Sequence, residues 1–125
     1  NLARDDGRPW LEAGAGEGHI IRAALAIRPN IEFHAVEMRP HGLDPVGPDT
    51  CTLLAQAGAA AITIGDFLTY SPGNFLNFPL DVRRQSRKPF SVGIFNPPFS
   101  LAMEFAHRAL QLCDTVLSEL VPDAA

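Results

Sequence analysis

The stretch Trp10-Leu11-Glu12-Ala13-Gly14-Ala15-Gly16-Glu17-Gly18 decides the fold. Its first four residues are an apolar run that predicts a strand, and apolar residues four apart predict a helix over residues 19–28. The three glycines between them allow a sharp turn and let a ligand approach the backbone without meeting a Cβ. They also leave N–H groups free at the start of the helix. The plainer alternative is a glycine turn that only connects the two elements.

Further strands are predicted outward from this unit at residues 31–36, 60–64, 90–95 and 115–121, with a helix at 50–57 closed by Gly58. Ser100 is expected to cap a last helix. Strands that alternate with helices, joined by right-handed crossovers, predict an α/β, Rossmann-like open parallel sheet with helices on both faces and strand order 3-2-1-4-5. The last helix is expected to bury one face, made of Ala102, Phe105, Ala106, Ala109, Leu112 and Cys113.

Composition excludes several classes of protein. The 125 residues are 46% hydrophobic with a net charge of −4, which is typical of one globular domain spanning residues 1–125. The longest charge-free stretch, residues 50–65, is too short and too polar to cross a membrane. The N-terminal residues carry no secretory signal. The acidic balance disfavours a stand-alone, tight nucleic-acid binder.

Cysteine and histidine placement gives no sign of a metal site. Cys51 and Cys113 stand alone, which favours a reduced, cytoplasmic compartment, and we expect neither thiol to be reactive. The histidines lack the spacing of metal ligands; they are His19, His34, His41 and His107. The sequence does not indicate an oligomeric state.

Polar or aromatic motifs follow the strands at the edge where parallel strands end. Glu37 lies 19 residues after Gly18, where an acid can accept both hydroxyls of a ribose. Asp66 can accept from an adenine amino group, and Phe67 can pack on its ring. The plainer alternatives are a solvated carboxylate at Glu37, a chain-capping role for Asp66 and a core position for Phe67. A dinucleotide fingerprint would place its third glycine at position 19, which is His19.

Asn96-Pro97-Pro98-Phe99 is the most specific motif. The prolines fix φ and remove N–H donors, so the loop presents carbonyl oxygens. The Asn96 amide oxygen and the Pro97 carbonyl can accept the two hydrogens of one amino group, and Phe99 offers a face for a planar base. The plainer alternative is a loop that merely ends a strand.

Together these residues resemble class I S-adenosylmethionine-dependent methyltransferases that methylate amino groups, typified by DNA adenine-N6 methyltransferases. The resemblance spans residues 10–112. It implies that the glycine turn, from Glu12 through Gly14 and Gly16 to Gly18, holds the methionine part of the cofactor. It also implies that Glu37 binds the ribose, that Met38, Asp66 and Phe67 contact the adenine, and that residues 96–99 form the catalytic loop.

The resemblance implies in-line transfer of a methyl group to a target amine positioned by Asn96 and Pro97. With duplex DNA as substrate, the base would be flipped out of the helix and stacked on Phe99. RNA bases and a protein glutamine amide are alternative substrates. Because relatives usually carry more sheet and a target-recognition region, we expect the chain to be an incomplete domain. An incomplete domain leaves open a non-catalytic module that binds a nucleoside cofactor. A dehydrogenase is a further alternative.

One basic cluster stands outside these motifs, formed by Arg83, Arg84, Arg87 and Lys88. Since it precedes the strand at 90–95, we expect it at the opposite edge of the sheet, as a solvated face rather than a phosphate site.

Overall fold

A computed structural model describes residues 7–40, 46–72, 88–95, 97 and 99–118 of the chain. The strands are β1 (Trp10–Ala13), β2 (Phe33–Glu37), β3 (Ala61–Ile64), β4 (Phe90–Phe95) and β5 (Cys113–Ser118). The α-helices are α1 (His19–Ile27), α2 (Thr50–Ala57) and α4 (Ala102–Leu112), and two short 3-10 helices are η1 (Phe67–Thr69) and η3 (Phe99–Leu101).

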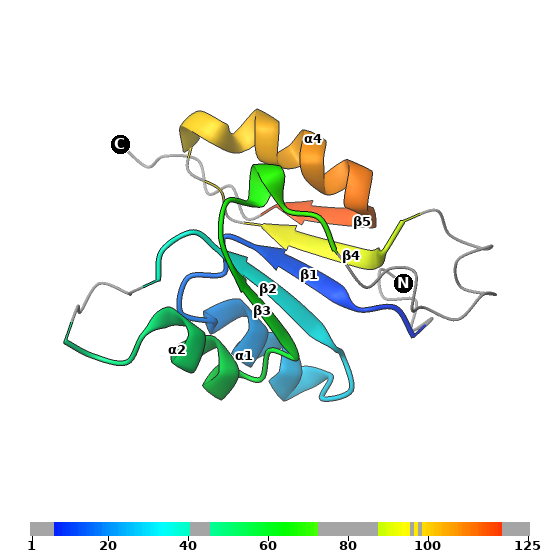
Figure 1. The fold of residues 1–125 in the computed structure, drawn as a ribbon. Helices are drawn as coiled ribbons and strands as arrows, with labels where there is room; N and C mark the ends of the chain where they lie inside the picture. Colours follow the sequence, from blue (N-terminus) through cyan, green and yellow to red (C-terminus); the bar gives the residue numbers. More distant parts are fainter. Residues whose placement is uncertain (1–6, 41–45, 73–87, 96, 98, 119–125) are drawn as a thin grey trace.

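The strands form one parallel sheet in the order β3-β2-β1-β4-β5, which confirms the predicted topology. All five arrows in Figure 1 run toward the same edge. Ala13 pairs in register with Val36 of β2 and with Phe95 of β4. The loops that follow β1, β2 and β4 therefore start side by side.

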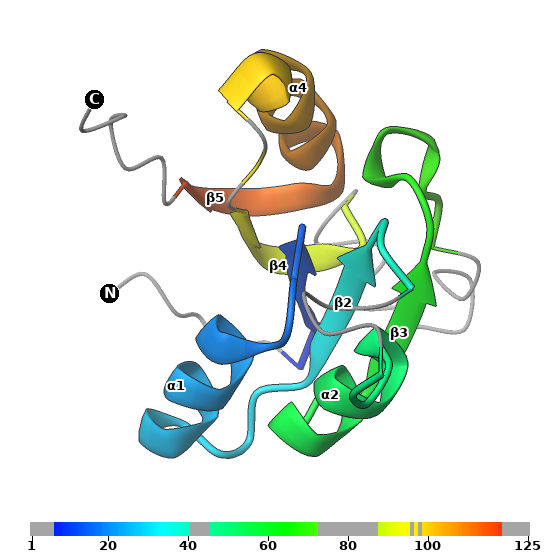
Figure 2. The same ribbon diagram turned by 90° about the vertical axis from the view of Figure 1, so that its left-hand side faces the viewer.

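Helices cover both faces of the sheet, as predicted (Figure 2). The α1 and α2 helices lie on one face, and α4 lies on the other together with η1. Each face has its own core. Under α1 and α2 the buried residues are Ala15, Ile21, Phe33, Ala35, Leu54 and Ala57. Under α4 they include Leu11, Val36, Phe67, Phe95, Phe105 and Ala109.

The junction of α4 and β5 differs from the prediction. Ser100 lies in η3, and the residue that precedes the first turn of α4 is Leu101, which makes no side-chain cap. The predicted cap is therefore wrong. Cys113 begins β5 instead of extending the helix, although it is buried, and β5 starts two residues before the predicted position 115. Backbone angles switch from helical to extended at Cys113 with no intervening loop.

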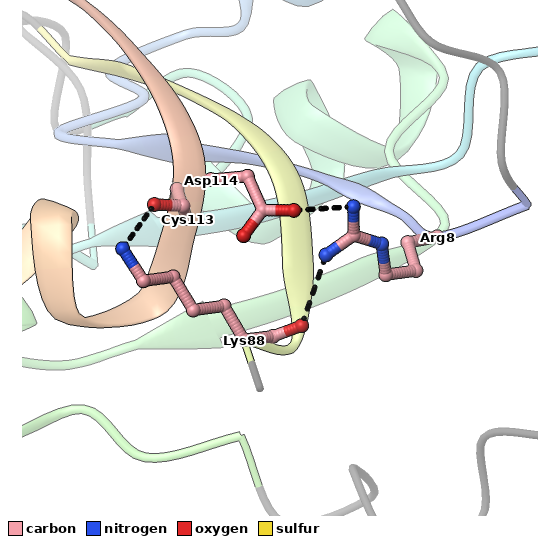
Figure 3. A network of polar contacts seen from close by, with 4 residues as sticks. All are labelled: Arg8, Lys88, Cys113 and Asp114. Carbon is pink, nitrogen blue, oxygen red and sulfur yellow. Dashed lines mark hydrogen bonds and ion pairs between the residues drawn. The ribbon is translucent and has the colours of Figure 1, made fainter. Parts of the chain in front are cut away.

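A polar network fastens the edge where the strands begin (Figure 3). The Arg8 guanidinium donates to the Lys88 carbonyl oxygen (3.2 Å) and pairs with the Asp114 carboxylate (2.6 Å). The Lys88 ammonium donates to the Cys113 carbonyl oxygen (3.3 Å). The network joins the segment before β1 to the starts of β4 and β5. Lys88 thus lies at the edge opposite the glycine turn, whereas Arg83, Arg84 and Arg87 lie outside the described residues.

Candidate functional site

A cavity of about 560 Å³ lies at the edge where β1, β2 and β4 end. Its size falls within the ~300–1,000 Å³ that is typical of small-molecule and cofactor sites. The sequence-predicted residues that line it are Glu12, Gly14, Gly16, Glu37, Met38, Phe67 and Pro97. The structure therefore brings the β1 loop, the β2 loop, η1 and the loop after β4 to one space.

The glycine turn contains three residues in the left-handed region, with φ of 74° at Gly14, 58° at Gly16 and 88° at Gly18. Gly16 faces open space, since a Cβ added there would meet no atom within 4 Å. A Cβ on Gly18 would lie 2.6 Å from the Ala57 Cβ of α2. Gly16 thus leaves room for a ligand, while Gly18 lets α1 and α2 pack and does not line the cavity.

Glu37 ends β2 with a side chain only 8% exposed. Its Oε1 accepts from the Gly16 N–H (2.8 Å), and its Oε2 accepts from the Arg39 N–H (3.0 Å). The Arg39 Nε lies 3.4 Å from the same Oε2, on a side chain that is 63% exposed. A carboxylate has about four acceptor positions. Glu37 can therefore still accept from a ligand hydroxyl.

Two further carboxylates lie along the cavity. Glu12 is 1% exposed and sits in β1 between Ala35 and Ile94. Glu17 lies at the mouth of the cavity, 3.7 Å from the exposed His19 ring. The described lining residues therefore include three acidic side chains, the Arg39 guanidinium and the His19 ring. Glu37 pairs with Arg39 and Glu17 with His19, so part of this acidic charge is already matched within the site.

Asp66 and Phe67, neighbours in sequence, have different environments. Asp66 Oδ1 accepts from the Leu68 N–H (2.9 Å) and caps η1, and the residue does not line the cavity. Phe67 is 2% exposed and packs against Phe105 and Tyr70, with ring centroids 5.1 and 6.4 Å away. It also lines the cavity. The predicted adenine contact of Asp66 stays a prediction.

The tetrapeptide Asn96-Pro97-Pro98-Phe99, whose catalytic role is a prediction, is described in part. Pro97 is buried and lines the cavity. Phe99 begins η3, and its side chain lies outside the description, as do Asn96 and Pro98. Their predicted roles stay predictions, and Pro97 is the member of the motif that shares the cavity with the glycine turn.

Comparison with known proteins found no matching family model, no similar curated protein and no similar solved structure. Within the described ranges, every helix is too short or too polar to cross a membrane.

Several lining residues were not predicted as site residues, and Leu101, Phe105 and Arg39 are the ones that add new chemistry to the cavity. Leu101 and Phe105, four residues apart at the start of α4, add an apolar wall beside Phe67 and Pro97. Their position just after the Pro-Pro loop was an available signal, since ligands of open α/β sheets bind at the carboxyl ends of the strands and this helix follows such an end. Arg39 carried no signal, because an arginine after a strand is ordinarily solvated.

Proposed function

We propose that this protein is an S-adenosylmethionine-dependent N-methyltransferase that acts on an exocyclic amino group, with adenine N6 in DNA as the preferred candidate. One observation carries the proposal. The glycine turn, Glu37 and Pro97, which are far apart in sequence, line the same cavity at the carboxyl ends of the strands. In open α/β sheets this edge is where ligands bind.

The lining residues fit the cofactor. Gly16 leaves space where any side chain would intrude, and Glu37 retains acceptor capacity for a ribose hydroxyl. Apolar surface from Met38, Phe67 and Leu101 suits a planar ring. The acidic side chains that line the cavity are compatible with a sulfonium cation. A dehydrogenase stays an alternative, which a response of the protein to NAD would favour.

When bound, S-adenosylmethionine would supply a methyl group activated by a positively charged sulfur. The residues of the chain would bind and orient. Glu37 would hold the ribose, and the apolar wall of Leu101 and Phe105 would exclude water. By resemblance, Asn96 and the Pro97 carbonyl oxygen would accept the two hydrogens of the target amine and so direct its lone pair. The target nitrogen would gain the methyl group as the bond between sulfur and that methyl group breaks. It would lose one proton to bulk water as the products, including S-adenosylhomocysteine, leave the site.

The substrate is proposed from the tetrapeptide alone, so RNA bases and a protein glutamine amide stay alternatives. Nucleic acid, most specifically DNA, is the proposed partner, and the cytoplasm is the proposed compartment. A non-catalytic module that binds a nucleoside cofactor is the second candidate function. The observation that favours it is that the described lining residues belong largely to the glycine turn and the β2 loop, which the resemblance assigns to the cofactor, whereas Pro97 alone comes from the tetrapeptide.

Transfer of a labelled methyl group separates these candidates. The protein is incubated with methyl-labelled S-adenosylmethionine and, in turn, duplex DNA, single-stranded RNA and a glutamine peptide. We expect label in DNA, and in duplexes prepared with N6-methyladenine in place of adenine we expect none. Cofactor binding without transfer to any substrate would favour the non-catalytic module.

Asn96→Ala tests the proposed catalytic role. Its expected result is unchanged affinity for S-adenosylhomocysteine with loss of transfer. Asn30→Ala is the matched control, because Asn30 is an exposed asparagine in the loop between α1 and β2. Parallel loss of binding and transfer in Asn96→Ala would contradict the assigned role.

A further inference from the structure

The Glu37 carboxylate lies between two loops that both line the cavity. One oxygen accepts from Gly16 in the loop after β1, and the other accepts from Arg39 in the loop after β2, at 2.8 and 3.0 Å. Both donors are main-chain N–H groups, and the acceptor is a side chain that is 8% exposed. Hydrogen bonds to an ionised acceptor are about twice as strong as neutral ones, and burial strengthens them further.

We propose that Glu37 is a positioning residue that braces the two loops and forms the cavity before any ligand binds. The Gly16 N–H points to Glu37, whereas its neighbours in the turn use main-chain acceptors: Gly14 N–H donates to the Val36 carbonyl oxygen and Gly18 N–H to the Ala15 carbonyl oxygen. Glu37 therefore fixes the part of the turn that faces the ligand space. The brace anchors the left-handed turn at Gly16 by its N–H, while the position of a Cβ on the same residue is open.

The contacts of the Glu37 carboxylate also predict which of them a bound ligand would replace. Of its three contacts, the one with Arg39 Nε is the longest, at 3.4 Å, and comes from a largely exposed side chain. A ligand diol that needs two acceptor positions would use the vacant one and displace this contact. The two main-chain contacts would remain. Binding then costs little ordering of the loops, which is the advantage of a preformed site.

Amide hydrogen exchange of the ligand-free protein tests the brace without any assumption about the ligand. The Gly16 and Arg39 amides of the wild type should exchange at least about tenfold more slowly than unprotected amides, which is equivalent to about 1.4 kcal/mol. In Glu37→Gln one of the two N–H groups would face an amide NH₂, so at least one of them should lose its protection. Amides in the core of β1 and β4 should keep theirs.

Two further variants sharpen the result. Glu37→Asp keeps the charge and shortens the side chain by one methylene, so it cannot span both donors and should also lose protection at one amide. Glu32→Gln is the matched control, because Glu32 is an exposed carboxylate that pairs with His34 at 2.8 Å and does not line the cavity. It should leave both amides protected.

The affinity readout rests on the proposed function, whereas the exchange readout does not. We expect Glu37→Gln to raise the dissociation constant for S-adenosylhomocysteine by at least about tenfold. If the wild type fails to bind S-adenosylhomocysteine but shows the protection pattern, the brace stands and the proposed function fails. Rapid Gly16 exchange in the wild type would overturn the brace whether or not the variants fold. Protection that is unchanged in Glu37→Gln would overturn it too, and would leave Glu37 as a ligand contact only.

Discussion

Two glycines of the same turn are expected to respond differently to alanine. At Gly18 the new Cβ would lie 2.6 Å from the Ala57 Cβ and 3.3 Å from a methyl of Leu54. The Ala57 Cβ is fixed to the α2 backbone, so the helix would have to move. At Gly16 the same change meets no atom within 4 Å. The pair therefore separates packing from backbone strain.

The magnitudes follow from these contacts. A left-handed backbone costs a non-glycine residue about 1–2 kcal/mol, and this cost applies to both variants, with φ of 58° and 88°. In each variant, about 0.4–1 kcal/mol of this cost is offset because alanine lowers the conformational entropy of the unfolded chain. Overpacking adds about 1–3 kcal/mol at Gly18 only. We therefore expect Gly18→Ala to lose about 1–3 kcal/mol more stability than Gly16→Ala.

Urea denaturation measures the difference. Trp10 is the single tryptophan, and it packs edge-on against Phe33 at 5.9 Å, so its fluorescence reports on the sheet. With a slope of about 1–3 kcal/mol per molar urea, the expected gap between the two midpoints is of the order of 1 M. Equal midpoints, or a lower midpoint for Gly16→Ala, would refute the assignment of Gly18 to helix packing.

Three further outcomes are expected. Asp66→Ala should lose about 1 kcal/mol of stability in urea denaturation because the cap on η1 is removed, whereas Asp66→Asn should keep its stability. Weaker binding of S-adenosylhomocysteine by a stable Asp66→Asn variant would support the adenine contact, and unchanged binding would argue against it. A thiol reagent at pH 8 should modify Cys51 at the rate of an exposed thiol with no activating neighbour, and Cys113 only on unfolding, because burial raises the pKa of the Cys113 thiol to about 12 and keeps it protonated. Mass spectrometry that finds both modified at similar rates would contradict this. Arg8→Met should lower the free energy of unfolding by about 1–2 kcal/mol, because the two contacts of Arg8 in Figure 3 are lost, and the loss should be smaller in high salt. A denaturation midpoint equal to that of the wild type would argue against the network.

Much of the fold could be predicted because glycine and proline residues mark where its helices and strands end. The α2 helix has the predicted bounds, since Gly58 adopts φ of 107° at its end. The end of α4 could not be found in the same way, because residues 99–121 contain no glycine or proline to mark the change from helix to strand. The apolar pattern continues from helix into strand, so the boundary depends on packing and not on local sequence.

The residues of the candidate site could be predicted where their position follows from the end of a strand. Glu37 and Pro97 follow strands, and the register of the parallel sheet brings them to one edge. Gly18 and Asp66 were predicted on the same grounds, but each has a local contact that accounts for it, with Ala57 in one case and with the Leu68 N–H in the other. The sequence offered the capping role of Asp66 as an alternative but could not choose between the two roles. The contact of Gly18 is tertiary, and a single sequence does not reveal it.

Ligand-dependent stability of the whole chain tests the central claim most directly, namely that this cavity binds S-adenosylmethionine. Unfolding is followed with S-adenosylhomocysteine or NAD, for the wild type and for Gly16→Val, whose side chain would fill the ligand space. At about 100 times its dissociation constant, S-adenosylhomocysteine should stabilise the wild type by about 2.7 kcal/mol, NAD should not, and Gly16→Val should lose the response. Stabilisation by NAD alone, no response to S-adenosylhomocysteine, or an equal response in Gly16→Val would contradict the account.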